Sequence, residues 1–244
     1  AEDPNFPEIP KITPGESQPD SERVSSFVYP GGILAVHSSG RGKDAIWAAL
    51  KNKNVYGTSG PRILLWFDLI NSPQGKLPMG SEITMSQNPR FIVRAAGSLK
   101  QKPGCSKESI DSMSPKRLDY LCAGECYNPT NEREIIEKME IIKITPQIYA
   151  GEAVSPLIQD PWMTMPCKGK GECIVEFEDQ NYTRDSIYYV RAIQEPTAAI
   201  NGSPLSQREG FELCKGSFRT NLEDDCLSMA NERAWSSPIY VNKP

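Results

Sequence analysis

The sequence predicts a chain of mixed class, with one short αβ step followed by a β-sandwich-like region that disulfides hold together. Residues 29–69 have the pattern of a strand, a polar turn, a short amphipathic helix, a tight turn and a second strand. Beyond residue 70, short apolar runs are separated by turn-rich segments, which is typical of a β-sandwich. All seven cysteines lie beyond residue 100, mostly in segments with the composition of loops, which favours disulfides.

The chain divides into three predicted segments. Residues 1–27 contain five prolines among acidic and serine residues, which excludes a helix or a central strand and indicates an extended arm or linker. Residues 28–61 form the αβ segment. Residues 62–244 form the β-sandwich-like region.

Within the αβ segment, residues 32–37 (GGILAVH) predict a short buried strand. Residues 43–52 predict the one clear long helix of the chain, packed through Ile46 and Leu50 on its apolar face. The TSGP sequence at residues 58–61 predicts a sharp turn. Residues 62–70 (RILLWFDLI) then predict a strand that is too apolar for an exposed edge.

Further strands are predicted at residues 91–96, 138–144, 174–177, 186–193 and 238–241. The run SIYYVRAI alternates two sets of side chains, as in a strand whose two faces differ. Two connections, residues 97–133 and 195–232, are long for a compact domain and contain most of the cysteines. We therefore expect crosslinks in these connections.

The cysteine spacing favours disulfides over a zinc site. Zinc sites use pairs such as CxxC, and the nearest approach is Cys122 and Cys126, with three residues between them and no histidine nearby. Short loops favour pairing Cys167 with Cys173. The same reasoning pairs Cys214 with Cys226. Cys105 would then pair with Cys122 or Cys126, and the seventh cysteine is a candidate for a bond to another chain.

Composition excludes several classes of protein. The net charge is -4 with acidic and basic residues interspersed, so we expect no nucleic-acid partner. No apolar run reaches about 18 residues, so we expect no membrane span. The chain begins without an initiator methionine, as expected of a mature, trimmed or proteolysed product. The disulfides predict an extracytoplasmic location, periplasmic or secreted.

His37 is the only histidine and follows a predicted strand, which favours a catalytic role. The alternative is a histidine that bonds to local backbone. Four residues in the SSGRGK and TSGPR turns are candidates for binding an anion or substrate: Ser39, Arg41, Ser59 and Arg62. The alternative is a pair of ordinary turns with solvated arginines. Arg62 carries more weight than Arg41, because it precedes a buried strand where a charge needs a partner.

Three motifs together resemble a known family. They are PGGILAVHSSGRGKDAIWAALKNKNVYGTSGPRI, the pair DSIYYVRAIQEPT and INGSPL, and DDCLSMANERAWSSPIYV. They resemble the C-terminal part of a secreted or periplasmic family of unassigned function in the PHP (polymerase and histidinol phosphatase) metallohydrolase superfamily. The resemblance covers roughly residues 28–244.

This resemblance implies a distorted αβ barrel with a metal cluster at one mouth, followed by a β-sandwich-like extension. Residues 28–61 would be the last αβ step of the barrel, with His37 at its mouth. The family's metal-binding motifs, His-x-His and Ser-Asp-x-His, have no counterpart in this sequence and are expected upstream of Ala1. The complete protein would therefore bind a divalent metal, and this chain alone would bind none. Its partner would be the N-terminal part of the same precursor, with or without a disulfide link.

Two hypotheses for the function follow. In the first, the chain is the C-terminal portion of a secreted PHP-type metal-dependent hydrolase, for example a phosphoesterase, and is not catalytic by itself. One histidine cannot supply the several imidazoles that such sites use. In the alternative, the chain is a disulfide-stapled β module with a binding or structural role after proteolytic processing.

Overall fold

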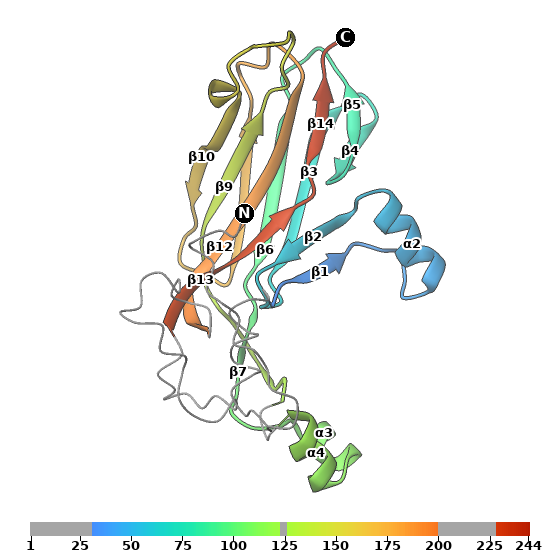
Figure 1. The fold of residues 1–244 in the computed structure, drawn as a ribbon, viewed down its shortest axis with the longest axis vertical. Coiled ribbons are helices and arrows are strands. Elements are labelled where there is room, and N and C mark those ends of the chain that lie inside the picture. The colour runs from blue at the N-terminus through green and yellow to red at the C-terminus, as the bar shows by residue number, and fades with distance from the viewer. Residues whose placement is uncertain (1–30, 123–125, 200–227) are drawn as a thin grey trace, which may run out of the picture.

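The computed structural model describes residues 31–122, 126–199 and 228–244, and these residues form two open β-sheets and a separate strand pair (Figure 1). The larger sheet has eight strands among the described residues: β1 (Ile33–Val36), β2 (Val55–Thr58), β5 (Glu82–Thr84), β9 (Ile136–Ile144), β10 (Ile158–Pro166), β12 (Ser186–Ala199), β13 (Ser228–Ser236) and β14 (Ile239–Asn242). Its main path runs β1-β2-β13-β12-β14-β5, and β9 joins β12 to β10. The β-rich character predicted for the chain is confirmed.

The smaller sheet has the order β11 (Glu172–Glu178), β6 (Arg90–Ala96), β3 (Leu64–Ser72) and β4 (Gly75–Pro78). Strands β7 (Leu99–Gln101) and β8 (Pro129–Arg133) form a separate antiparallel pair. The described helical elements are α2 (Lys43–Lys51), α3 (Lys107–Ser112), α4 (Pro115–Cys122) and the 3₁₀ turn η1 (Ser155–Leu157). Helices α3 and α4 lie at the far end of β7, away from the two sheets (Figure 1).

The two sheets enclose one apolar core. Phe67, Phe91 and Phe177 of the smaller sheet stack on one another, and Phe91 also meets Tyr188 of the larger sheet with ring centres 4.8 Å apart. Along β12, the alternating residues Tyr188, Val190 and Ala192 are fully buried. This confirms the two-faced strand predicted from SIYYVRAI. Burial of aromatic and branched side chains from both sheets supplies the main stabilisation of the fold.

The predicted barrel step is wrong. Strands β1 and β2 pair antiparallel, from Ile33 opposite Thr58 to Val36 opposite Val55. A barrel of repeated αβ units requires parallel strands, and both sheets in the described part of the chain are open. Helix α2 instead returns the chain beside β1, and β2 continues the sheet through antiparallel pairing with β13. The segment is therefore an edge extension of the larger sheet.

Because this segment lies at the edge of the larger sheet, its strand and helix are less buried than the sequence predicted. Strand β1 is not buried, since Leu34 is 60% exposed. The predicted helix is present as α2, but Ala49 is its buried residue, whereas Ile46 and Trp47 are exposed. It is not the one long helix, because α4 has eight residues against nine in α2.

The other predicted strands are present as β3, β6, β9, β11, β12 and β14. The sequence patterns missed the long strands β10 and β13 and the short strands β2, β4, β5, β7 and β8. The predicted arm at residues 1–27 lies outside the described residues. No helix in the described ranges has the length and apolar character that a membrane crossing requires.

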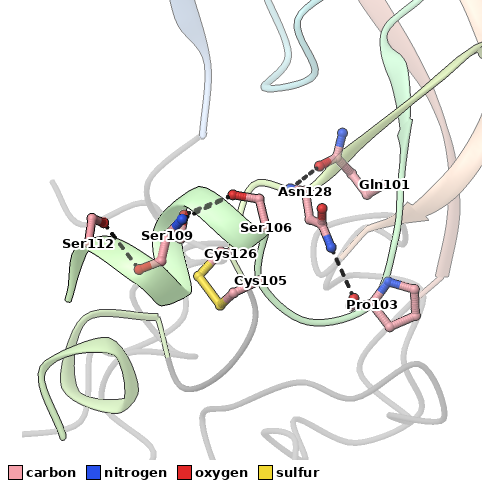
Figure 2. The surroundings of a disulfide bond; sticks show 8 residues. All are labelled: Gln101, Pro103, Cys105, Ser106, Ser109, Ser112, Cys126 and Asn128. Carbon is pink, nitrogen blue, oxygen red and sulfur yellow. Dashed lines mark hydrogen bonds between the residues drawn. A yellow bond between two sulfur atoms is a disulfide. The ribbon is translucent and has the colours of Figure 1, made fainter. Parts of the chain in front are cut away.

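Two predicted disulfides are confirmed. Cys167 is bonded to Cys173, and Cys105 to Cys126, with Cα atoms 5.7 and 4.6 Å apart. The second bond lies where the chain enters α3, close to Gln101 and Asn128 at the base of the β7–β8 pair (Figure 2). The side chain of Cys122, together with Cys214 and Cys226, lies outside the described residues, so their pairing stays a prediction.

Removing the Cys105–Cys126 bond by changing both residues to serine should loosen the 102–128 connection and leave the core intact. The bond closes a loop with a sequence separation of 21 residues, for which the expected stabilisation is about 3 kcal/mol. Amide hydrogen exchange should speed up at Lys102 and Cys126 but not in β3 or β6. Cys167→Ser with Cys173→Ser serves as the control. Faster exchange throughout β3 and β6 in the first variant would contradict this expectation.

Candidate functional site

His37 lies directly after β1 and links this edge extension to the smaller sheet. Its Nε2 donates a hydrogen bond to the carbonyl oxygen of Leu65 at 2.8 Å, since a carbonyl only accepts. Its ring lies near the rings of Tyr56 and Trp66, with centres 5.3 and 5.9 Å away. Among the described strands, β4 pairs with β3 only from Asp68 onward, so His37 caps an otherwise open stretch of the β3 edge. The catalytic role of His37 stays a prediction.

The backbone of Leu65 also forms a hydrogen bond with Tyr56, one of the two aromatic residues beside His37. Burial raises the pKa of Tyr56, and a hydrogen bond with the backbone of Leu65 opposes the shift to a smaller extent. Tyr56 therefore stays a neutral phenol near neutral pH. The His37 and Tyr56 side chains together satisfy backbone groups of β3, which is a structural use of both residues.

The residues of the two predicted turns do not converge on one site. Ser39 and Arg41 are exposed in the turn before α2. Ser59 connects β2 to β13: its hydroxyl donates to the carboxylate of Glu232 and accepts the N–H of Arg233 at 2.8 Å. Of the four predicted anion-binding residues, only Arg62 lines the cavity described next.

Arg62 lies at a cavity of about 730 Å³, which we call the Arg62 pocket. The cavity lies between the 60–62 turn, β7, the segment before β8, the segment before β9, and the C-terminal part of β12. Its ionisable and aromatic lining residues are Arg62, Lys100, Tyr127, Glu134 and Glu195. A cavity of this size is within the usual range for small-molecule sites.

The guanidinium of Arg62 stacks on the ring of Tyr127, with its central carbon 3.9 Å from the ring centre. Within the described part of the chain, no carboxylate lies within 4.0 Å of Arg62. Stacking uses the face of the guanidinium and leaves the in-plane N–H groups for a planar acceptor. Arg62 is therefore oriented and has no carboxylate partner among the described residues.

Two glutamates that line the same pocket, Glu134 and Glu195, share a hydrogen bond. Burial raises the pKa of Glu134, the hydrogen bond and negative charge of Glu195 raise it further, and Lys100 opposes the shift. Glu195 is held by the backbone, since its Oε1 accepts the N–H of Ile135 at 2.7 Å. Glu134 therefore keeps its proton to a higher pH than an isolated glutamate would.

Close backbone packing places Glu134 against β12. A Cβ at Gly97 would clash with the backbone oxygen of Glu134, so only glycine permits this approach. The N–H of Glu134 bonds to the oxygen of Ser98 at 2.9 Å, and Ser98 in turn binds the side chain of Gln194 through its N–H and hydroxyl. Gln194 precedes Glu195, so this chain of contacts brings the two carboxyl groups together.

The Cys105–Cys126 disulfide is shown in Figure 2. Tyr127 directly follows Cys126 in the sequence, so this crosslink restrains its position. Asn128 fixes the other side of Tyr127: its N–H donates to Gln101 Oε1 at 3.0 Å and its side-chain amide donates to the oxygen of Pro103 at 3.2 Å. The ring that supports Arg62 is therefore held by a covalent crosslink and by the β7–β8 pair.

The sequence patterns did not indicate Lys100, Tyr127, Glu134 and Glu195 as site residues. Glu134 precedes one predicted strand and Glu195 follows another, and antiparallel pairing of β9 with β12 brings these two ends together. The position of both glutamates at the ends of predicted strands was the sequence signal that could have indicated them. The described residues contain no group of three or more His, Cys, Asp or Glu placed to hold a metal ion.

Comparison with known proteins identifies similarity over part of the chain. A family described as protein of unknown function (DUF3604) matches residues 10–103. The match includes β1, α2, Arg62 and Lys100, and it ends before Tyr127, Glu134 and Glu195. No curated protein matches the chain. The similarity gives no activity for the chain and does not connect it to the PHP superfamily.

Proposed function

We propose that this chain is a non-catalytic β-module of a larger extracytoplasmic hydrolase, and that it binds an anionic group at the Arg62 pocket. The observation that carries the binding role is the stacked guanidinium, without a carboxylate partner in the described part of the chain, in a cavity that Glu134 and Glu195 also line. This arrangement also favours a binding role over a purely structural one for the module.

The hydrolase part of the proposal is based on the three motifs that resemble the secreted PHP-type family. In that proposal, the N-terminal part of the precursor supplies the metal ligands and the chemistry. The only histidine of this chain is already engaged with Leu65, which supports a non-catalytic role for the chain. Two disulfides are compatible with an extracytoplasmic location.

The purified chain should hydrolyse no phosphoester and hold no stoichiometric transition metal. Metal analysis after purification and an assay with p-nitrophenyl phosphate in the presence of Mn²⁺ or Zn²⁺ test this expectation. If the chain shows residual activity, the His37→Gln variant tests whether His37 is responsible, because glutamine keeps a side-chain donor toward Leu65. Two or more tightly held metal ions per chain, or turnover that His37→Gln abolishes, would overturn the non-catalytic assignment.

A further inference from the structure

We propose that the Arg62 pocket binds the carboxylate of a hydroxylated acid, of the kind found in uronic-acid sugars. This inference rests on the proposed function, because it names the ligand class of the same pocket. Three features of the lining support it: the cation that is present, the backbone groups that are already used, and the hydrogen-bonding groups of the other lining residues.

The cation is suited to a planar monoanion. A guanidinium presents two parallel N–H groups that match the two oxygens of a carboxylate. The stack on Tyr127 fixes the plane in which these N–H groups point. Lys100, which lines the same cavity, adds a second positive charge, and its contact with Glu132 is long, at 4.0 Å.

The backbone of the neighbouring turn does not form a phosphate site. The N–H of Ser59 donates to the oxygen of Arg233 at 3.0 Å, and the N–H of Gly60 donates to the hydroxyl of Thr58 at 3.2 Å. These amides are therefore not available to surround a phosphate, unlike those of a phosphate-binding loop. The glutamate pair would also repel a dianion more strongly than a singly charged carboxylate.

Other residues of the pocket lining are suited to hydroxyl groups. Glu134 and Glu195 offer several acceptor oxygens, and Glu134 also offers an O–H donor where it is protonated, so these residues can bind vicinal hydroxyls. Thr197 adds a hydroxyl, while Leu99 and Met229 offer apolar contact for the C–H face of a ring. The volume of about 730 Å³ admits a single sugar ring.

Binding should weaken as the pH rises. The charged groups that act on Glu134 are Lys100 and Glu195, and Arg62 lines the same cavity. An incoming carboxylate is repelled less when Glu134 holds its proton. Because the pKa of Glu134 is raised, this proton is present below that pKa and is lost above it. Affinity for the acid should therefore fall as the pH rises through the pKa of Glu134.

Isothermal titration calorimetry with the disulfide-bonded chain tests the inference, using D-galacturonate as the probe. Neutral D-galactose, acetate and inorganic phosphate are the comparison ligands. We expect galacturonate to bind at least about tenfold more tightly than acetate or phosphate, and galactose to bind without measurable heat. Arg62→Ala should weaken galacturonate binding by roughly 10- to 100-fold, as for the loss of a charge-assisted hydrogen bond.

Arg94→Ala is the matched control, because Arg94 also stacks on an aromatic ring, at 4.0 Å from Trp66, but does not line the pocket. It should leave galacturonate binding unchanged. Glu134→Gln keeps the size of the side chain and should remove most of the pH dependence, which makes the inference testable even if Arg62→Ala folds poorly. Unchanged pH dependence in Glu134→Gln would contradict the role given to the Glu134 proton.

The outcomes separate the inference from the proposed function. Equal binding of galactose and galacturonate would overturn the carboxylate assignment. Preference for phosphate, or acetate binding as tightly as galacturonate, would overturn the hydroxylated-acid class while leaving an anion site at Arg62. No binding of any of the four ligands would overturn both, as would an equal loss of affinity in Arg94→Ala and Arg62→Ala.

Discussion

Asp179→Ala should lower the free energy of unfolding by about 3–5 kcal/mol, the largest effect expected for a single substitution in this fold. Asp179 is 1% exposed and accepts hydrogen bonds from the ammonium of Lys143 and the hydroxyl of Tyr188, the latter at 2.5 Å. Its second oxygen accepts the N–H of Asn181 at 3.0 Å. Alanine would leave a buried ammonium and a buried phenol without their acceptor.

The position of this group between the sheets increases the expected effect. Lys143 belongs to β9 and Tyr188 to β12 of the larger sheet, whereas Asp179 directly follows β11 of the smaller sheet. Burial and the hydrogen bond to Asp179 both raise the pKa of Tyr188, so the phenol remains a donor throughout the ordinary pH range. The loss of Asp179 therefore removes a polar connection between the two sheets inside the apolar core.

Equilibrium unfolding in urea measures this effect. Asp68→Ala is the matched control, since the partner of Asp68 is Lys76, whose side chain is 62% exposed. Removal of that ion pair should cost less than about 1 kcal/mol. A loss below about 1 kcal/mol in Asp179→Ala would show that water or a rearranged partner replaces the carboxylate.

Local patterns predicted the strands that form the core. The alternation in SIYYVRAI and the apolar run RILLWFDLI depend only on which side chains must be buried, and β12 and β3 follow these patterns. The pairing of Cys167 with Cys173 was also predictable, because the loop between them is short. These features depend on neighbouring residues in the sequence.

Long-range pairing was not predictable from the same patterns. A strand, helix and strand in succession fit both a parallel crossover and an antiparallel return, and the choice is fixed here by β2 pairing with β13, where Trp235 lies opposite Gly57. The Arg62 pocket likewise depends on contacts between residues that are far apart in the sequence. The charge of Arg62 beside a buried strand indicated a binding role, but Tyr127 and Glu195 reach it from distant segments.

Gly80→Ala should lower the free energy of unfolding by about 2–4 kcal/mol, because two separate effects add at this position. The backbone of Gly80 has a φ of +88°, which side-chain-bearing residues rarely adopt. A Cβ there would also clash with the backbone oxygens of Lys53 and Asn52, at the end of α2. Neither contact can be relieved by rotating a side chain.

Gly75→Ala separates the two effects, because Gly75 has a φ of +89° but a Cβ added to it would meet no atom within 4 Å. This control should lose only about 1 kcal/mol, from the backbone conformation alone. The N–H of Gly80 donates to the oxygen of Pro238 at 2.9 Å, and the Asn54 side chain donates to the oxygen of Met79 at 2.8 Å. The clash in Gly80→Ala should therefore displace the α2–β2 connection from the start of β14, and urea unfolding of both variants measures the difference. Equal losses in the two variants would mean that the chain near Lys53 moves aside at little cost, and that the edge extension is only loosely held to the larger sheet.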